Sequence, residues 1–180
     1  TKIRSINSNL GTFVLGDSCE PKDTMGILSL CKDARLNIIE KLKIKNPNHA
    51  IHTFDETTDL SDLTQNEIEL FNGTIKNRDL LKKALSELQQ KEPNHTLIGE
   101  LLTEHHQELR DVLQVSTPKI ETMLDAAMNA GALGGKINGS GGGGCMFAYA
   151  PNNPEQVASA IERVGGKAFI IKLDEGTRTD

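Results

Sequence analysis

The sequence predicts a single α+β domain over residues 1–180, with a ferredoxin-like split βαβ core and additional inserted helices. Three observations lead to this fold class. Short apolar runs near both ends of the chain are typical of strands, central segments have the apolar spacing of amphipathic helices, and a glycine-rich stretch runs directly into a charge-free apolar segment. In order, the segments read strand, several helices, strand, strand, helix, strand. Without the extra helices this is β-α-β-β-α-β.

The first third of the chain contributes one strand and one long helix. Residues 12–17, TFVLGD, form a short apolar run that predicts a buried strand. Apolar side chains then recur at helical spacing from Met25 to about Lys45, and Asn46-Pro47-Asn48 ends this helix. Residues 51–63 contain a cluster of Asp and Glu, which predicts a solvated loop; a metal site is the less common alternative.

The central block is predicted to be helical, with helices over residues 64–71, 75–90, 96–113 and 118–130. Pro118 suits a first helical turn, and Ser116 and Thr117 before it are suitable caps.

Two strands, a helix and a last strand complete the chain. The strands are expected near residues 135–138 and 145–150, and the helix from Asn153 or Pro154 to Val164. Residues 167–173 are largely apolar, which predicts a buried strand, and the polar tail from Asp174 is expected to fray.

The feature that calls for a functional explanation is the stretch GALGGKINGSGGGG, residues 131–144, which holds half of the chain's 16 glycines. Glycine inside an element costs about 0.5–1 kcal/mol relative to alanine. Its use is backbone that takes positive φ and offers N–H groups to an anion. We therefore expect a loop that faces a phosphate or a substrate; a tight glycine hairpin or a flexible linker is the alternative.

Two common phosphate motifs do not fit this stretch. Gly139, Gly141 and Gly144 have the spacing G-x-G-x-x-G, but the dinucleotide fingerprint needs a helix after it, and residues 145–150 read as a strand. The P-loop is excluded because Lys136 is followed by Ile137.

Composition excludes several classes of protein. A net charge of −5 argues against nucleic-acid binding, and no run of about 18 apolar residues predicts a membrane span. Cys19, Cys31 and Cys145 are far apart and form no C-x-x-C pair, so we expect neither a disulfide framework nor a zinc site, and a cytoplasmic location.

Few side chains indicate chemistry by themselves. Asp17 is either a substrate contact or a helix cap, and Lys136 could neutralise a phosphate. Cys145 follows the glycines, but no base can be assigned beside it, so a packing role is preferred. Adjacent His105 and His106 point about 100° apart on a helix and do not form a metal-binding pair. The residues alone predict no catalytic group and no metal site in this chain.

Two segments resemble the GHMP kinases, which phosphorylate galactose, homoserine, mevalonate and phosphomevalonate. Residues 109–124, LRDVLQVSTPKIETML, are similar to the H-x-x-L-R-D and V-S-x-P-E-L-D run of galactokinases, with His106 in the histidine position. Residues 131–145 are similar to the C-terminal glycine loop of the family, and residues 13–18 resemble the strand that leads into its C-terminal half. The resemblance covers nearly the whole chain and is most specific over residues 105–147.

The resemblance implies the C-terminal domain of an ATP-dependent kinase, most similar to galactokinases and with a sugar as the expected acceptor. The family's N-terminal domain carries the main ATP loop and the catalytic acidic residue, and neither is found in this chain; the start at Thr1 agrees. ATP and Mg²⁺ would be bound mainly by that partner domain, and the isolated chain is expected not to turn over ATP. The residues implied to face the phosphates or the acceptor are Gly139, Ser140, Gly141, Gly142, Gly143 and Gly144, with Asp17 and Ser18 approaching the same cleft.

The sequence also departs from galactokinases. These have MTGGGFGG where residues 137–144 read INGSGGGG, and their Tyr-Asn-x-Arg-Arg signature is replaced near residues 30–35. Mevalonate, phosphomevalonate and homoserine therefore remain alternative acceptors. A free-standing ferredoxin-like module that binds a small anion and a non-catalytic sugar sensor are the other two classes.

Overall fold

The computed structural model describes residues 6, 9–22, 24–45, 47 and 52–174. In chain order the helices and strands are β1 (Thr12–Asp17), α1 (Thr24–Lys45), α2 (Gln65–Leu88), α3 (His95–Asp111), α4 (Pro118–Asn129), β2 (Gly134–Ile137), β3 (Cys145–Tyr149), α5 (Pro154–Arg163) and β4 (Lys167–Lys172).

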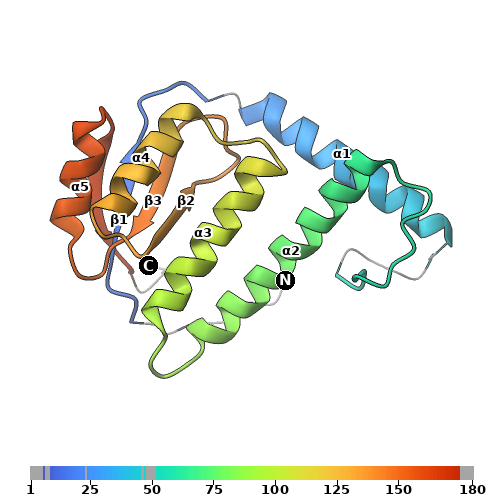
Figure 1. Ribbon diagram of the computed structural model, residues 1–180, viewed down its shortest axis with the longest axis horizontal. Coiled ribbons are helices and arrows are strands. Elements are labelled where there is room, and N and C mark those ends of the chain that lie inside the picture. Colours follow the sequence, from blue (N-terminus) through green and yellow to red (C-terminus); the bar gives the residue numbers. More distant parts are fainter. Residues whose placement is uncertain (1–5, 7–8, 23, 46, 48–51, 175–180) are drawn as a thin grey trace, which may run out of the picture.

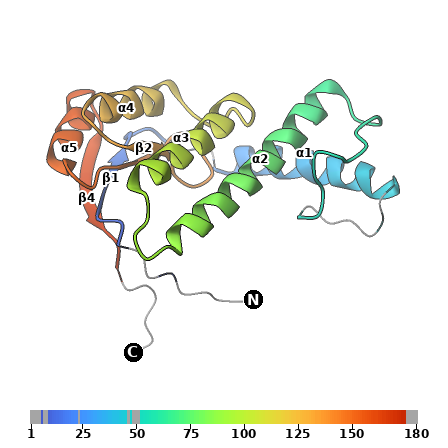
Figure 2. The ribbon, with the colours of Figure 1, turned by 60° about the horizontal axis from the view of Figure 1, so that its bottom comes forward.

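The four strands form one sheet in the order β2-β3-β1-β4, and every neighbouring pair is antiparallel. This is the predicted split βαβ arrangement. Helices α4 and α5 cover one face of the sheet, whereas α2 and α3 form a long hairpin beside it, with α1 beyond (Figures 1 and 2). Among the described residues, none of the helices has both the length and the apolar composition needed to cross a membrane.

The main core lies between the sheet and the helix pair α4 and α5. Alternate residues of β1 point into it, and Val14 is fully buried there. Gly16, on the same side of β1, leaves room for the side chains of Met123, Met146 and Ile161. The buried members of this core are Val14, Ile120, Met123, Leu124, Ala127, Ala132, Ile137, Met146, Ala148, Ala150, Val157 and Ile161.

Helix α3 packs on the opposite side of the sheet and lies closest to β2. The contact needs two glycines, because a Cβ on Gly134 would lie 1.8 Å from the carbonyl oxygen of Gly99. Nearby, the buried Tyr149 ring stacks on Phe13 with 4.7 Å between centroids, and its hydroxyl donates to the Leu10 carbonyl over 2.7 Å. This second, smaller core fixes α3 relative to the strands.

Helix boundaries follow the local signals. Thr64 caps α2 in a capping box with Glu67, and Asn94 caps α3. Thr117 caps α4 with Pro118 in the first turn, which confirms that prediction, whereas the Ser116 hydroxyl turns to the carboxylate of Glu121 instead. Part of the predicted end of α1, of the loop 51–63 and of the tail after Asp174 lies outside the described residues.

The prediction of two helices over residues 64–71 and 75–90 was wrong, because α2 is continuous. The composition of residues 72–74, Asn-Gly-Thr, is typical of a break between two helices. In the fold, Gly73 provides close contact with Val112 of the neighbouring helical segment, and the Thr74 hydroxyl bonds to the Leu70 carbonyl within the same helix over 2.7 Å. Tertiary contact overrides the weak local signal.

The prediction that residues 167–173 form a buried strand was half wrong. The strand exists as β4, but it lies at the edge of the sheet and its side chains are mostly exposed. Phe169 is 51% exposed and Ile171 is 41% exposed. Nothing in the described part of the chain covers these side chains on the face opposite α4 and α5.

Candidate functional site

The glycine loop joins β2 to β3 and is held from three directions. The Asn138 N–H donates to the Cys145 carbonyl over 2.8 Å and closes the hairpin. On one side the Ser18 N–H, just after β1, donates to the Gly144 carbonyl over 2.8 Å, and on the other the Gly142 N–H donates to the Val115 carbonyl over 2.7 Å. The loop is therefore a fixed structure and not a flexible linker.

The backbone of this loop explains its composition. Five of its glycines have φ between +73° and +104°, a region that side chains disfavour: Gly139, Gly141, Gly142, Gly143 and Gly144. Ser140 stands among them, and its hydroxyl oxygen is buried with no hydrogen-bond partner among the described residues. A buried polar group left unpaired costs about 1–3 kcal/mol, so the Ser140 hydroxyl has an unmet requirement for a hydrogen-bond partner.

Asp17 and Ser18 lie beside this loop, as the sequence predicts. The Asp17 carboxylate accepts a hydrogen bond of 2.9 Å from the Cys19 N–H, and Cys19 itself has a φ of +60°. This tight turn presents the buried Ser18 to the loop. The carboxylate therefore holds the turn, whatever further contact it makes with a ligand.

Lys136 is directed elsewhere. Its ammonium donates to the Ile137 carbonyl over 2.8 Å and lies 5.2 Å from the centre of the Phe147 ring. Burial lowers its pKa. These contacts hold the ammonium over the sheet, so the structure does not bring Lys136 to the glycines in the way the sequence interpretation assumed.

Lys22 is the cation that lies at the loop, and sequence reasoning missed it. Its ammonium is 3.4 Å from the Asn138 carbonyl oxygen, and its side chain is the nearest neighbour of Gly139 and Gly144. The only signal was one basic residue in the polar turn after the first strand, which is too common a pattern to single out.

Cys145 fits the packing role. Burial, together with the nearby Asp17 carboxylate, raises the pKa of its thiol. A thiol with a raised pKa is a poor nucleophile at neutral pH. No group of three or more His, Cys, Asp or Glu side chains comes together as a metal site within the part of the chain that the structure describes.

His106 is buried and links three elements around the loop. Its Nδ1 accepts a hydrogen bond of 3.2 Å from the Ile137 N–H at the end of β2, so the proton of the neutral ring is on Nε2. Nε2 lies 2.8 Å from a carboxylate oxygen of Glu121 on α4, to which it donates. His106 of α3 thus fixes the strand that enters the loop.

Glu121 is, with His106, at the centre of a hydrogen-bond network, which we call the His106–Glu121 network. Burial would raise its pKa, but the Ser116 hydroxyl, His106 and Arg110 outweigh that effect and hold the pKa of the carboxyl below its usual value. Ser116 belongs to the connection between α3 and α4, next to the Val115 carbonyl that accepts from Gly142. The His106–Glu121 network therefore supports the start of the loop at Ile137 and borders the connection that holds Gly142.

We expect His106→Leu to destabilise the fold by about 2–4 kcal/mol, because it leaves the buried Ile137 N–H unpaired and removes a charge-assisted bond to Glu121. His106→Asn is the matched variant, since its amide oxygen can still accept from the Ile137 N–H. The free energy of unfolding in urea should be lower for His106→Asn than for the parent chain and higher than for His106→Leu. Equal loss in the two variants would show that the Ile137 bond contributes nothing.

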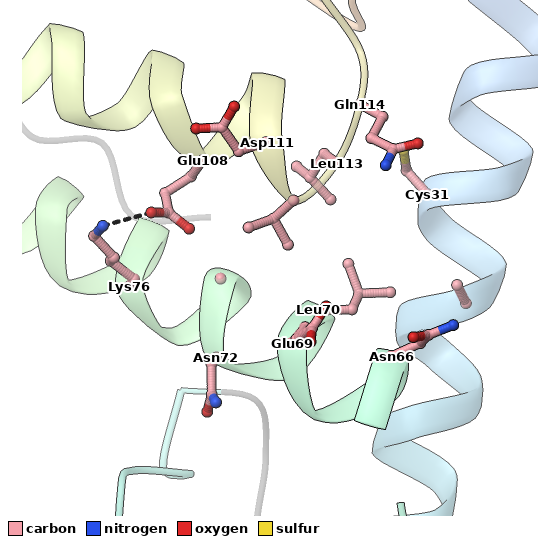
Figure 3. A pocket seen from close by; sticks show the side chains of 13 residues that line it. Cys31, Asn66, Glu69, Leu70, Asn72, Lys76, Glu108, Asp111, Leu113 and Gln114 are labelled. Carbon is pink, nitrogen blue, oxygen red and sulfur yellow. Dashed lines mark hydrogen bonds and ion pairs between the residues drawn. The ribbon is translucent and has the colours of Figure 1, made fainter. Parts of the chain in front are cut away.

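A polar hollow of about 800 Å³ lies between α1, α2 and the end of α3 (Figure 3). Acidic side chains of Glu69, Glu108 and Asp111 line it, and its Lys76 is paired with Glu108. Gln114, which has a φ of +52°, also lines it, one residue before the Val115 that holds the glycine loop. The hollow and the loop are therefore on opposite sides of one short connection.

Comparison with known proteins agrees with this geometry. The family model for the C-terminal domain of GHMP kinases matches residues 78–167, half of the chain. The chain belongs to the GHMP kinases. The matched residues include α3, α4 and the glycine loop, whereas Asp17, Ser18 and Lys22 lie outside the match.

Curated relatives include several mevalonate kinases. The chain is 47% identical over 97 residues to the mevalonate kinase of Thermococcus onnurineus, which is 53% of this chain and 28% of the relative. It is 40% identical over 103 residues to that of Pyrococcus abyssi, 57% of this chain and 30% of the relative. A galactokinase of Mycobacterium bovis is 35% identical over 69 residues, 38% of this chain and 19% of the relative. The matched part of the chain thus spans less than a third of each relative.

Solved structures have the same fold. Lactococcus lactis galactokinase, complexed with galactose, superposes with a TM-score of 0.74 at 20% identity, over 92% of this chain and 45% of that one. The mevalonate kinase of Methanococcus jannaschii superposes with a TM-score of 0.58 at 20% identity, over 94% and 43%. At this identity the likeness concerns the fold.

Proposed function

We propose that this chain is the C-terminal domain of an ATP-dependent small-molecule kinase, and that mevalonate is the acceptor. The observation that carries the phosphoryl-transfer part is the fixed glycine loop with the unpartnered Ser140 hydroxyl inside it. A loop of this kind offers N–H donors and a hydroxyl donor to phosphate oxygens without reorganisation at the moment of reaction.

The residues fit a bound nucleotide phosphate. Backbone N–H groups of residues 139–144, except that of Gly142, which is bonded to the Val115 carbonyl, would hold its oxygens together with the Ser140 hydroxyl and the Lys22 ammonium. Asp17 and Ser18 keep the loop in place. ATP bound there supplies the phosphoryl group that the acceptor hydroxyl receives. A companion domain would provide the main ATP loop, the catalytic acidic residue and most of the contacts to Mg²⁺.

The relatives and the charge of the site support mevalonate as the acceptor. Galactose, expected from the galactokinase resemblance, is the second candidate, because the mevalonate kinases are 40–47% identical over about half of this chain and the galactokinase is 35% identical over a shorter segment. Mevalonate is an anion, and the acidic side chains of the polar hollow would repel it. We therefore place the acceptor at the glycine loop and not in that hollow.

Release of ADP by the full-length gene product tests this function. With Mg-ATP, we expect turnover with mevalonate that exceeds the rate without acceptor, and none with homoserine. Turnover with galactose alone would keep the kinase and replace the acceptor. The isolated 180-residue chain should release no ADP.

Absence of turnover with mevalonate, phosphomevalonate, galactose and homoserine would contradict the kinase. If galactose still bound under those conditions, a sugar sensor would be the better account. If only inorganic phosphate or nucleotide bound, the chain would be an anion-binding module.

A further inference from the structure

The chain crosses the glycine loop on its way from β1 to α1. We call residues 18–22 the strap. At its first residue the Ser18 N–H donates to the Gly144 carbonyl over 2.8 Å, and at its last the Lys22 ammonium donates to the Asn138 carbonyl over 3.4 Å. Asn138 and Gly144 are the two ends of the connection between β2 and β3, so the strap spans the glycine loop from one end to the other.

The middle of the strap packs closely against the loop. Gly143 has a φ of +104°, and a Cβ added there would lie 2.8 Å from the Pro21 carbonyl oxygen. Within the strap, the Glu20 N–H donates to the Ser18 hydroxyl over 3.3 Å. The ring of Pro21 fixes its own φ, which further restricts the backbone that leads to Lys22. A shift of the backbone at Glu20 is therefore transmitted to Lys22, two residues later.

The Glu20 side chain ties the strap to a helix from a distant part of the chain. The Thr117 hydroxyl donates to its carboxylate over 3.1 Å, across 97 residues of sequence. Thr117 caps α4, so the carboxylate lies at the N-terminus of that helix, where the helix dipole favours a negative charge. Ile120, in the first turn of α4, is fully buried in the main core. The strap is therefore tied to an element that the core holds in place.

The position of the Lys22 ammonium depends on its backbone. The residue is exposed, and its hydrogen bond to Asn138 is long at 3.4 Å. Ordering a lysine side chain costs conformational entropy, which a single long hydrogen bond offsets poorly. Because the backbone is tied down at Glu20, the ammonium can reach fewer positions, and these lie at the glycine loop.

We propose that Glu20 is a positioning residue for the phosphate site: its bond to Thr117 fastens the strap and thereby keeps the Lys22 ammonium at the glycine loop. This rests on the proposed kinase function, in which Lys22 contacts a nucleotide phosphate. Glu20 acts through Lys22, since its own carboxylate is an anion and would repel the phosphate. Glu20→Ala removes the bond to Thr117, whereas Glu20→Gln removes the charge and keeps an oxygen that can accept from the Thr117 hydroxyl. The two variants therefore separate the bond from the charge.

Limited proteolysis of the full-length gene product tests whether Glu20 fastens the strap. Trypsin cleaves after Lys22, and its rate follows the population in which the strap has come loose. Cleavage after Lys43, exposed in the last turn of α1, is the internal reference for general unfolding. Each rate at Lys22 is read by mass spectrometry and divided by that of a synthetic peptide with the same substitution, which removes any effect of the substitution on trypsin itself.

The corrected ratio of cleavage after Lys22 to cleavage after Lys43 should rise about three- to tenfold in Glu20→Ala, as expected for the loss of one hydrogen bond. Glu20→Gln should stay within about twofold of the parent protein. An unchanged ratio in Glu20→Ala would overturn the proposal. An equal rise in the two variants would overturn it as well, because the charge and not the bond would then hold the strap.

A double-mutant cycle tests whether Glu20 acts through Lys22. Titration calorimetry measures the Kd of Mg-ATP for the full-length protein. Lys22→Met should raise this Kd about tenfold or more, as expected for a lost charge-assisted hydrogen bond, and Glu20→Ala about three- to tenfold. In the Lys22→Met background, Glu20→Ala should raise it by less than about twofold, because the group that Glu20 positions is gone. A role of Glu20 in the general stability of the fold would give additive losses instead.

Additive losses, or a parent-like Kd for Lys22→Met, would therefore overturn the proposal. Coupled losses without ADP release for any acceptor would leave the role of Glu20 standing and remove the kinase. If the parent protein failed to bind Mg-ATP, the phosphate role of Lys22 would fall together with the kinase. The proteolysis result would then still decide whether Glu20 fastens the strap.

Discussion

Gly141→Ala is expected to lower kcat/KM for ATP of the full-length enzyme about a hundredfold, which is the loss typical of a displacement of about 1 Å near the reacting groups. Gly141 has a φ of +85°, and a Cβ there would lie 2.5 Å from both the carbonyl oxygen and the Cβ of Val115. That same carbonyl accepts the Gly142 N–H. The substitution therefore separates the glycine loop from the connection that supports it.

Gly139→Ala is the matched control for this prediction. Its φ of +75° is similar, so the cost of a positive φ, about 1–2 kcal/mol, is shared by both variants. The nearest atom to its added Cβ is the Lys22 ammonium at 3.1 Å, the end of a flexible side chain that can move away. We expect Gly139→Ala to lose about tenfold or less. Steady-state kinetics of the two variants tests this prediction, and thermal unfolding checks that both are folded. Equal losses of kcat/KM in the two variants would mean that the contact with Val115 does not matter.

Much of the fold could be predicted because the residues at the ends of its helices and strands carry local sequence signals. Thr117 and Pro118 begin α4, and Pro154 begins α5, because each meets the backbone requirements of a first helical turn. The strand boundaries at the glycine loop followed from another local signal, the change from a glycine-rich stretch to an apolar segment. The glycines themselves identified the loop, since only they take positive φ at so many neighbouring positions.

The errors have a common cause, which is packing that no local pattern records. The interior of α2 contains a sequence typical of a break, and contact with Val112 keeps it helical. The apolar sequence of β4 predicts burial correctly only for a protein in which another surface covers Phe169 and Ile171. The sequence pattern of a segment thus predicts whether its side chains need to be packed or buried. It does not predict which part of the protein packs against them.

The candidate site shows the same limit. Ser140 and the glycines were accessible to sequence reasoning because they are consecutive. Lys22 and His106 reach the loop from distant positions, and their roles depend on a side chain crossing to Asn138 and on a ring bonded to Ile137. Contacts of this kind follow from tertiary structure alone.

Gly134→Ala should be among the most destabilising single substitutions in the chain, lowering the free energy of unfolding by about 3 kcal/mol or more. Overpacking a well-packed contact typically costs about 1–3 kcal/mol, and we expect the upper end or more because backbone has to move here. The added Cβ would lie 1.8 Å from the Gly99 carbonyl oxygen and 2.7 Å from its Cα. Neither is the end of a side chain, so α3 has to leave β2. For a domain of this size the midpoint of thermal unfolding should fall by roughly 6–12 °C.

Gly73→Ala is the control, because Gly73 is also at a close helix contact. Its nearest neighbours are side-chain atoms, Val112 Cγ1 at 2.8 Å and a Glu108 carboxylate oxygen at 3.2 Å, and alanine gains about 1 kcal/mol of helix propensity there. Its unfolding free energy should change by less than about 1 kcal/mol. A parent-like midpoint for Gly134→Ala would show that α3 is not held against β2.

The same substitution connects stability to the site. Gly134 and Ile137 are the two ends of β2, and α3 carries both Gly99 and His106. If α3 moves away by even 1 Å at Gly99, the 3.2 Å hydrogen bond from the Ile137 N–H to His106 is lost, and the strand that enters the glycine loop loses its support. Gly134→Ala should therefore reduce ATP turnover by the full-length enzyme at temperatures well below its unfolding midpoint, whereas Gly73→Ala should not. Because Gly134 sets how closely α3 approaches β2, it also sets where the glycine loop begins.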